Sequence, residues 1–385
     1  MSINYKRLGD IATYINGYAF KPKDWGTKGL PIIRIQNLTG SSKEINFYDG
    51  DIDEKYIVRK GDILIAWSAS LGVHEWNGEK ALLNQHIFKV VFDKEKINKN
   101  FFKFMVQKLL ERTQKYLHGS TMKHITKKYF DNLLIPFPPL EIQEKIAGTL
   151  LLAESLVNKR KAQIESLDQL TQSVFLEMFG DIRINSKKFK QVKLNEVITK
   201  ITTGKSLAGE GISEYKVLKT SAVSYKFFKQ NEVKYLPQDY VPPVSHIVNK
   251  GDVLVSRMNT SELVGAAAYV FNEIKNVALP DRIWKLHYSR KINPIFLWYF
   301  INQSYFRDKV TDIATGTSGS MKNISQKKYL NLSILLPDIS LQNKFAEFVY
   351  KIQIEKDKMD KGLIELNNIF NSLMQRTFNG KLFPE

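Results

Sequence analysis

The chain has 385 residues, of which 57 are Lys or Arg and 39 are Asp or Glu, so its formal net charge is +18. At about 150 residues per domain this length predicts two or three domains, and 43% hydrophobic residues supply enough apolar side chains for packed cores. The absence of cysteine excludes disulfides, thiolate catalysis and Cys-ligated metal sites, while the positive charge favours an acidic partner such as nucleic acid.

The sequence contains no segment that predicts a membrane or secretory route. Residues 1–20 have charges scattered through them and no apolar signal core. The longest apolar run, LVGAAAYVF at 263–271, is about half as long as a bilayer-spanning helix. The six histidines form no HExxH motif or close pair, so no metal is expected. We therefore expect a soluble cytoplasmic protein.

Residues 1–138 are predicted to form a first α+β domain. Short β-rich runs at 30–36, 62–67 and 87–92 lie between Gly, Pro and Asn turns. A single helix is expected at 99–117, where aromatic and apolar residues recur without proline.

A long helix is predicted within residues 139–182. The prolines of PPLEIQ at 138–143 are typical of the residues just before a helix or in its first turn. Apolar side chains then recur at spacings of three, four and seven until FGD at 179–181. At 1.5 Å per residue, about 37 residues give a rod about 55 Å long.

Residues 183–336 predict a second α+β domain that, like the first, combines short β-rich runs with one helix. Its β-rich runs lie at 216–219, 253–256 and 283–287, and its helix is expected at 294–310. Each domain is thus expected to be closed by one helix.

Residues 337–385 predict a second long helix, which begins after PDISLQ at 337–342 and ends at FNG, 378–380. Two helices of matching length and phase can bury each other's apolar stripe, so we expect an antiparallel pair between the two domains. The alternative is that each helix packs only on its own domain. The predicted pairing residues are Ile142, Ile146, Leu156, Leu167, Val174, Phe345, Ile352, Met359, Leu366 and Leu373.

Motifs of the first half return in the same order in the second half. The matched pairs are KRLGDI (6–11) with VKLNEV (192–197), IVRKGDILI (57–65) with IVNKGDVLV (247–255), and GSTMKHITKKY (119–129) with SGSMKNISQKKY (318–329). Their separation grows from 186 residues, Leu8 to Leu194, to 199, Lys123 to Lys322. Ordered matches with small insertions indicate an internal repeat of two homologous halves, which predicts a pseudo-twofold structure.

The chain contains no motif that predicts catalysis. TGKS at 203–206 resembles the end of a nucleotide-binding loop, but Thr199 stands where that loop needs glycine. No GxGxxG follows a strand, and no Asn-Pro-Pro-Tyr tetrapeptide of the kind used on flipped adenines is present. DIDEK at 51–55 groups carboxylates with a lysine, and we interpret it as a solvated turn because the second half keeps only one of them.

Basic and aromatic residues fit a binding role better. Lysines that recur beside Gly-Ser stretches are suited to phosphate, although a solvated charged face is the alternative interpretation. Arg reads guanine, and Asn or Gln reads adenine, at the groove edge. The predicted DNA-binding residues are Arg34, Gln36, Trp67, Ser68, Gln85, His86, Lys123, Lys127, Lys128, Lys205, Arg257, Asn259, Arg282, Lys322, Lys327 and Lys328. The residues that follow the matched strands differ between the two halves: AWSAS at 66–70 is aligned with SRMNT at 256–260.

Two early motifs, GYAFK at 17–21 and PIIRIQN at 31–37, add to the repeated GSxMKxI and PxxxxQ ends. The second half keeps YKVLK at 215–219 as the equivalent strand, but TGKS at 203–206 replaces the glycine-aromatic-lysine entry. Across nearly its whole length the chain resembles the DNA-specificity subunits of type I restriction–modification systems, and the repeated end motif is the most specific part of this resemblance.

The resemblance implies an α+β fold with two similar β-rich target-recognition domains joined by two long antiparallel helices, which form a coiled-coil spacer. Each domain would read one half of a split, asymmetric sequence in double-stranded DNA. The helices would dock modification subunits, two in number, that bring S-adenosylmethionine, and restriction subunits that translocate with ATP. No cofactor is expected on this chain itself. The alternatives are a stand-alone adenine methyltransferase and a basic RNA-binding or membrane-surface module.

Overall fold

The computed structural model of the chain describes residues 4–68, 70–117, 126–224, 227–316 and 321–383. Helices and strands alternate with short connections through these residues, and the fold is α+β. This confirms the fold class predicted from the sequence.

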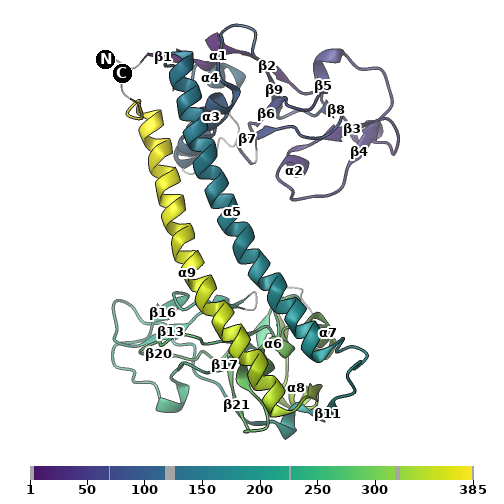
Figure 1. The fold of residues 1–385 in the computed structure, drawn as a ribbon, viewed down its shortest axis with the longest axis vertical. Helices are drawn as coiled ribbons and strands as arrows, with labels where there is room; N and C mark the ends of the chain where they lie inside the picture. The colour runs from purple at the N-terminus through teal and green to yellow at the C-terminus, as the bar shows by residue number, and fades with distance from the viewer. Residues whose placement is uncertain (1–3, 69, 118–125, 225–226, 317–320, 384–385) are drawn as a thin grey trace. The chain divides into compact units, whose positions relative to one another are not determined.

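The chain divides into two compact units. Unit 1 consists of Met1–Ala162 with Met359–Glu385, and unit 2 of Gln163–Lys358. Two long helices, α5 (Leu140–Phe179) and α9 (Ile339–Phe378), each contribute one part to unit 1 and one part to unit 2 (Figure 1). Both begin at the predicted proline-containing motifs and end before a glycine with positive φ, Gly180 or Gly380, the usual residue after a helix end.

Unit 1 is built from short strands and helices before and beside α5. Its strands are β1 (Tyr5–Arg7), β2 (Thr13–Asn16), β3 (Leu30–Ile33), β4 (Asn46–Tyr48), β5 (Ile57–Val58), β6 (Ile63–Ala66), β7 (Gly72–Glu75), β8 (Ala81–Leu83), β9 (Ile87–Val91) and β10 (Leu134–Pro136). Its helices are α1 (Leu8–Ile11), η1 (Pro22–Asp24), α2 (Ile35–Leu38), η2 (Glu54–Tyr56), α3 (Lys99–Leu117) and α4 (Lys127–Asp131).

The strands of unit 1 form three sheets. An antiparallel sheet has the order β2-β9-β6-β7, and a mixed sheet has the order β4-β3-β8-β5 with β3 and β8 parallel. β1 pairs with β10, which returns the chain to its start before α5 begins. The first two sheets and α3 enclose the apolar side chains of the unit.

Unit 2 repeats this pattern between the two long helices. Its strands are β11 (Lys190–Lys193), β12 (Ile198–Thr202), β13 (Lys216–Leu218), β14 (Val223–Ser224), β15 (Phe227–Phe228), β16 (Val233–Tyr235), β17 (Val253–Ser256), β18 (Met258–Asn259), β19 (Ala267–Tyr269), β20 (Val277–Ala278), β21 (Ile283–Tyr288), β22 (Lys322–Asn323) and β23 (Ser333–Leu336). Its helices are η3 (Leu194–Glu196), η4 (Thr220–Ala222), η5 (Val244–His246), α6 (Pro294–Ile301), α7 (Ser304–Ile313) and α8 (Gln326–Leu330).

The main sheets of unit 2 have the topology of those in unit 1, except that within the described residues no strand of unit 2 corresponds to β5 and that unit 2 adds the pairs β14-β15 and β18-β22. β12-β21-β17-β19 corresponds to β2-β9-β6-β7, and β16-β13-β20, with β13 and β20 parallel, corresponds to β4-β3-β8. β11 pairs with β23 as β1 pairs with β10. The internal repeat inferred from the sequence is therefore a repeat of the fold.

Side chains of the repeat make the same hydrogen bonds in both units. The ammonium group of Lys89 donates to the carbonyl of Ile57 at 2.7 Å, and that of Lys285 donates to the carbonyl of Ile247 at 2.7 Å. Each lysine lies on an inner strand of its sheet, β9 or β21, where a half-buried or buried ammonium group needs such a partner.

The repeated glutamine after the prolines fastens each long helix to its unit. Gln143 donates to the carbonyl of Pro138 at 2.9 Å and accepts from the backbone N–H of Asn98 at 3.0 Å. Gln342 is bonded in the same way to Pro337 and to the segment before α6. Both glutamines are fully buried, and these bonds satisfy their amides.

The two long helices pack antiparallel inside each unit. In the core of unit 1, Ile146 near the start of α5 lies in one apolar cluster with Phe378 at the end of α9. In the core of unit 2, Phe175 and Phe179 at the end of α5 contact Phe345 near the start of α9, with ring centroids 5.4 and 5.3 Å apart. The predicted antiparallel pair is confirmed in this sense for each unit.

One predicted pairing residue, Leu156, is not buried between the helices. Leu156 is 44% exposed, whereas Val157 beside it is buried. Buried positions repeat by seven from Leu150 through Val157, and Leu156 lies one residue, or about 100° around the helix, away from that seam. The other predicted pairing residues are buried (Ile146 and Phe345) or half-buried (Ile142, Leu167, Val174, Ile352, Met359, Leu366 and Leu373).

Two other predicted elements differ from the structure. The strand expected at 30–36 ends at Ile33, because Asn37 caps the backbone N–H of Arg34 and turns the chain into α2. The helix expected at 294–310 is interrupted at Asn302, whose amide side chain bonds both backbone groups of Ala267 in β19. In unit 1 the longer Gln107 reaches β7 from within a continuous α3.

Candidate nucleic-acid interface

Four segments at strand ends meet along one edge of unit 2, which we call the strand-end edge of unit 2 (residues 204–206, 256–260, 280–282 and 322–324). Arg257 follows β17 and donates its backbone N–H to the carbonyl of Arg282 at 2.9 Å, while its own carbonyl accepts from Ile324 at 3.2 Å. β18 pairs with β22, which sets Asn259 opposite Lys322. Four predicted DNA-binding residues are thereby brought together.

Side-chain contacts hold this edge in shape. The Arg257 Nε donates to Asn323 Oδ1 at 3.2 Å. Asn259 donates to the Ser256 hydroxyl at 3.2 Å and accepts from the backbone N–H of Thr260 at 2.9 Å. The Lys322 ammonium donates to the carbonyl of Gly316 at 2.8 Å. These polar groups are therefore positioned before any ligand binds.

Lys205 and Arg282 lie on the same edge but point into solvent. Both are exposed, and both flank a hydrogen bond between the Ser206 hydroxyl and the Asp281 carboxylate. Gly204 brings the two segments together by donating its N–H to the carbonyl of Pro280 at 3.1 Å. The two cations are thus free to swing toward an acidic partner while their backbones are fixed.

Unit 1 builds the equivalent edge, the strand-end edge of unit 1 (residues 16–18, 66–68 and 84–86). Trp67 follows β6 and donates its backbone N–H to the carbonyl of His86 at 3.2 Å, as Arg257 does to Arg282. Gln85 donates to the carbonyl of Tyr18 at 2.8 Å. The predicted residues Trp67, Ser68, Gln85 and His86 thus come together as well.

The side chains on this edge differ from those of unit 2. The Trp67 indole donates to Asn16 Oδ1 at 3.1 Å and packs edge-to-face on His86, with ring centroids 4.9 Å apart. His86 has a positive φ of 72°. Ser68 is buried, which removes it from the accessible surface. Aromatic rings in unit 1 therefore stand where unit 2 has two arginines.

A glycine permits the close backbone approach at both edges. A Cβ atom at Gly17 would overlap the carbonyl of Asn84, and a Cβ at Gly204 would overlap the carbonyl of Leu279. The residue after β2 and the second residue after β12 must therefore be glycine for the strand ends to meet. This is the physical role of the GYAFK and TGKS segments.

Arg34 and Gln36 lie beside the edge of unit 1 rather than on a strand. β3 ends at Ile33, whose carbonyl accepts from the backbone N–H of Asn84, so Arg34 is next to the 84–86 segment. Its guanidinium lies 5.3 Å from the ring centroid of Trp25, which is 42% exposed. Gln36 is half-buried in α2, not in the predicted strand.

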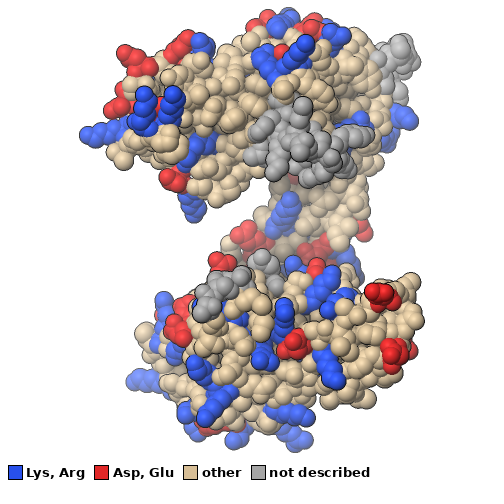
Figure 2. Space-filling model, turned by 180° about the vertical axis from the view of Figure 1, so that it is seen from behind, with Lys and Arg blue, Asp and Glu red and all other residues tan. Residues whose placement is uncertain are grey.

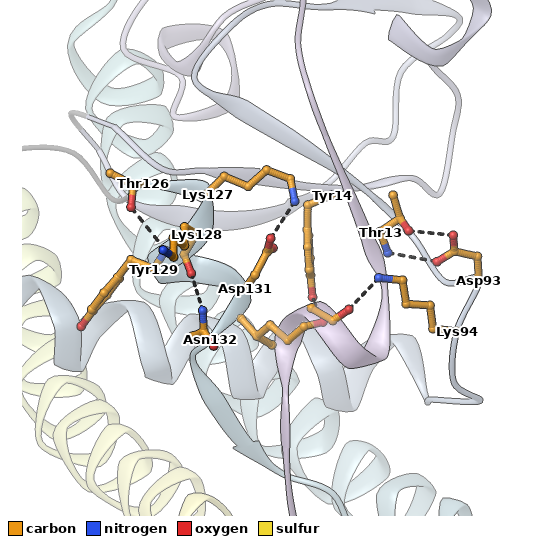
Figure 3. A network of polar contacts seen from close by, with 12 residues as sticks. Thr13, Tyr14, Asp93, Lys94, Thr126, Lys127, Lys128, Tyr129, Asp131 and Asn132 are labelled. Carbon is orange, nitrogen blue, oxygen red and sulfur yellow. Dashed lines mark hydrogen bonds and ion pairs between the residues drawn. The ribbon is translucent and has the colours of Figure 1, made fainter.

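The repeated lysines lie on the short helices α4 and α8. Lys127 is paired with Asp131 at 2.7 Å, and the carbonyl of Lys128 accepts from Asn132 (Figure 3). Thr126 caps this helix by accepting from the N–H of Tyr129. Lys127 and Lys128 are exposed, so phosphate can reach them, although Asp131 offsets part of the charge of Lys127.

The buried residue behind α4 shows how closely the helix is packed. Tyr14 donates its hydroxyl to the carbonyl of Leu8 at 3.0 Å (Figure 3). Burial, with the carboxylate of Asp131 nearby, raises the pKa of Tyr14 far above its ordinary value, so this hydroxyl remains protonated. The lysines of α4 therefore project from a helix that packs against buried residues.

In unit 2, Ser325 caps α8 in the same way by accepting from the N–H of Lys328 at 3.3 Å. Lys327 and Lys328 are exposed on this helix, a few residues after Lys322. Lys123, the remaining predicted contact, lies outside the described residues.

Positive charge is distributed rather than gathered. The excess of Lys and Arg over Asp and Glu is divided equally between the two units. On the face drawn in Figure 2, basic side chains are interspersed with acidic ones over both units. On that face an acidic polymer would therefore meet particular basic side chains rather than one broad basic patch.

Three side chains at the edges were missed by sequence reasoning. Asn323 holds the guanidinium of Arg257, Asn16 orients Trp67, and Asp281 accepts from Ser206. Asn323 belongs to the repeated SGSMKNI motif and could have been found there. The other two depend on contacts between distant segments, for which the sequence carries no signal.

Within the described residues, no group of three or more His, Asp or Glu side chains is placed to hold a metal ion. Across that same part of the chain, no helix has the length and apolar character needed to cross a membrane.

Comparison with known proteins places the chain beside one group. Residues 2–166 match the family described as "Type I restriction modification DNA specificity domain". The putative MjaX specificity subunit of Methanocaldococcus jannaschii is 30% identical over 94% of this chain and 89% of that protein. The MjaVIII specificity subunit of the same organism is 29% identical over 93% and 88%. The EcoKI specificity subunit of Escherichia coli K12 is 25% identical over 97% and 88%.

A solved structure has the same fold. The S subunit of a type I restriction–modification system from M. genitalium aligns with a TM-score of 0.59 at 16% identity, and covers 100% of this chain and 97% of that one. A chain from a structure of type I restriction–modification complex assembly aligns with a TM-score of 0.51 at 18% identity over 98% of both chains.

Proposed function

The chain belongs to the DNA-specificity subunits of type I restriction–modification systems, and we propose that each of its two units reads one half of a two-part DNA target with its strand-end edge. As a member of this family it is the DNA-recognition subunit of a restriction–modification complex. Family membership favours this function over the stand-alone methyltransferase and the RNA-binding or membrane-surface module.

One observation carries the proposal. The same meeting of strand ends is built twice, with equivalent backbone bonds from Trp67 to His86 and from Arg257 to Arg282, but with different side chains. A repeated backbone arrangement that carries different side chains suits the recognition of two different short sequences. Arg257 and Asn259 offer donors for guanine and adenine, respectively, whereas unit 1 has the aromatic rings of His86 and of Trp67, which stacks on Phe88.

Base reading and phosphate binding are assigned to different residues. We assign base contacts to Arg34, Gln36, Trp67, Gln85, His86, Arg257, Asn259 and Arg282. We assign phosphate contacts to Lys127, Lys128, Lys205, Lys322, Lys327 and Lys328, with Lys123 as a further phosphate contact from the sequence. Ser68 is better suited to supporting Trp67, because it is buried. Phosphate contacts fix register and strength, while base contacts carry sequence information.

The long helices are assigned two tasks, spacing and docking. Because α5 and α9 each contribute to both units, their length would fix the gap between the two DNA half-sites. Leu152 and Leu156 lie one turn apart on α5 and are 64% and 44% exposed. Exposed leucines at this spacing suit docking of an apolar helix from a partner. We assign the partner as a modification subunit, with two such subunits and restriction subunits completing the complex.

In this assignment the chain supplies no catalytic residue. The methyl donor, S-adenosylmethionine, and ATP would be bound by the partner subunits, so the chain needs no cofactor of its own. Its contribution is selection of the site at which the partners act.

The test is to read the methylated sequence in cells that express the modification subunit with wild-type chain, Arg257→Ala or Gln85→Ala. Each substitution should relax one half of the motif and leave the other half unchanged. The two substitutions should affect opposite halves. Relaxation of the same half by both, or of neither, would contradict the assignment of one edge to each half-site.

A further inference from the structure

The connection between β17 and β19 carries the main readers of unit 2. It spans residues 257–266 and includes β18, so that Arg257 and Asn259 project from a segment longer than a tight turn. The corresponding connection of unit 1 spans only 67–71, between β6 and β7. A longer connection needs more contacts to hold one conformation, because more backbone freedom is lost on ordering it.

The rear of this connection is anchored in the core of unit 2. Val264 is fully buried in the apolar cluster of the unit, and its N–H donates to the carbonyl of Thr260 at 2.9 Å. Gly265 donates to the carbonyl of Ser256 at 2.6 Å, which closes the connection onto the end of β17. The readers at the front therefore depend on how the segment 260–265 is held behind them.

Arg307 of α7 holds that segment. Its Nη2 donates to the carbonyl of Glu262 at 2.7 Å. The Nη1 atom would lie 3.0 Å from a Cβ at Gly265, and Val310, one turn further along α7, would overlap that Cβ. Gly265 has a φ of 74°, so its conformation and its lack of a side chain both admit α7 to this close contact.

Burying the guanidinium of Arg307 costs free energy. Burial lowers the pKa of Arg307 from its ordinary value, although a guanidinium remains protonated at neutral pH. Its Nη1 is buried and lacks a hydrogen-bond partner in the part of the chain that the structure describes. A shorter or apolar side chain would avoid that cost but could not reach the carbonyl of Glu262.

An arginine near the end of α3 in unit 1 does something different. Arg112 lies in α3, the helix that corresponds in the repeat to α6 and α7. Its guanidinium lies 4.1 Å from the ring centroid of Phe378, and its Nη2 lies 3.5 Å from Asn379 Oδ1. Arg112 thus supports the end of α9, and it offers a matched control.

We propose that Arg307 is a positioning residue for base reading by unit 2: it fixes the 260–265 segment so that Arg257 and Asn259 are presented in one conformation. The proposal rests on the proposed function of the strand-end edge and names a residue behind that edge which contacts no DNA. Without the guanidinium the readers remain, but they sample several conformations, so the preference for the correct base falls more than the affinity for DNA in general.

The experiment uses the full chain assembled with its modification subunit and measures methylation of two DNA libraries, each randomised in one half-site. Arg257→Ala first identifies the half read by unit 2. Arg307→Met should then reduce discrimination at that half by about tenfold, comparable to the effect of one mismatched base pair, while discrimination at the other half is unchanged. Arg307→Lys, which keeps a donor, should recover part of the loss.

Two further variants separate positioning from general damage. Gly265→Ala disturbs the same support from the other side and should reproduce the effect of Arg307→Met. Arg112→Met should lower thermal stability without changing discrimination at either half. Wild-type discrimination in Arg307→Met, or an equal loss at both halves, would overturn the proposal. A wild-type complex without any sequence preference would instead refute the proposed function.

Discussion

A matched insertion into both long helices tests whether their length sets the gap between the half-sites. Each helix has 40 residues, or about 60 Å at 1.5 Å per residue. Inserting seven residues between Ala162 and Gln163, and seven between Lys358 and Met359, lengthens each helix by about 10 Å. One heptad is chosen because it keeps the apolar seam of the pair in phase.

The insertion points keep two contacts between the helices within their own units. The guanidinium of Arg160 lies 3.5 Å from the carbonyl of Met359, and both residues stay in unit 1. The ion pair of Asp168 with Lys356, at 2.6 Å, stays in unit 2. A loss of activity through disrupted packing is therefore not expected.

About 10 Å corresponds to about three base pairs, because one DNA turn of 10–10.5 base pairs rises about 34–36 Å. Sequencing of methylated DNA from cells that express the altered chain should show the same two half-sites with a gap about three base pairs longer. Methylation at the original gap by the doubly extended chain would refute the spacer argument. Insertion into α5 alone is the control: it breaks the pairing and should lower the unfolding temperature without giving a new gap.

Other predictions address charge and pH. Lys327→Ala with Lys328→Ala should weaken DNA binding about equally on all sequences and reduce the salt slope by about 2, measured by titration at several salt concentrations. Asp168→Ala leaves the ammonium group of Lys356, which is 7% exposed, without its carboxylate. The substitution should lower the free energy of unfolding by about 1–2 kcal/mol, a modest loss because the Asp168 side chain is itself half-exposed. In chemical denaturation, adding Lys356→Met should recover most of that loss. Burial lowers the pKa of His74 below its ordinary 6.5, so the folded state binds fewer protons than the unfolded chain as the solution becomes acidic. The unfolding temperature should therefore fall as the pH drops below about 6.5. The fall should be smaller in His74→Gln.

Each of these results has a clear contrary outcome. A loss of binding by the lysine variants on one sequence only would mean that they read bases. Equal stability of the wild type and Asp168→Ala would mean that the ion pair contributes nothing. An unchanged acid response in His74→Gln would assign the pH dependence to other groups.

Much of the fold could be predicted because its signals are local or repeated. The heptad spacing, the proline entry motifs and the glycines after Phe179 and Asn379 define both long helices without any knowledge of their surroundings. The repeat works in the same way, since IVRKGDILI and IVNKGDVLV each form a turn followed by the central strand of a sheet. Hydrophobic spacing, capping and turn chemistry act over a few residues, and a single sequence therefore displays them.

The errors arise where distant segments compete with local preference. The 30–36 run has β propensity, but capping by Asn37 ends the strand early, and the bond from Asn302 to β19 interrupts the expected second helix. Leu156 fits the apolar spacings of three, four and seven, but the seam that is buried passes through Val157. A phase error of one residue is invisible until the partner surface is known.

The sequence by itself determined the class of the molecule: a duplicated α+β chain with paired helices and basic, aromatic strand ends. Only the tertiary structure decided which of those ends meet, that Ser68 is buried, that Asn323 holds Arg257, and that Arg307 and Arg112 contact different segments in the two units. The reason is physical: a side chain's identity fixes which bonds it can make, but only the packing of remote backbone segments fixes which partner is within reach.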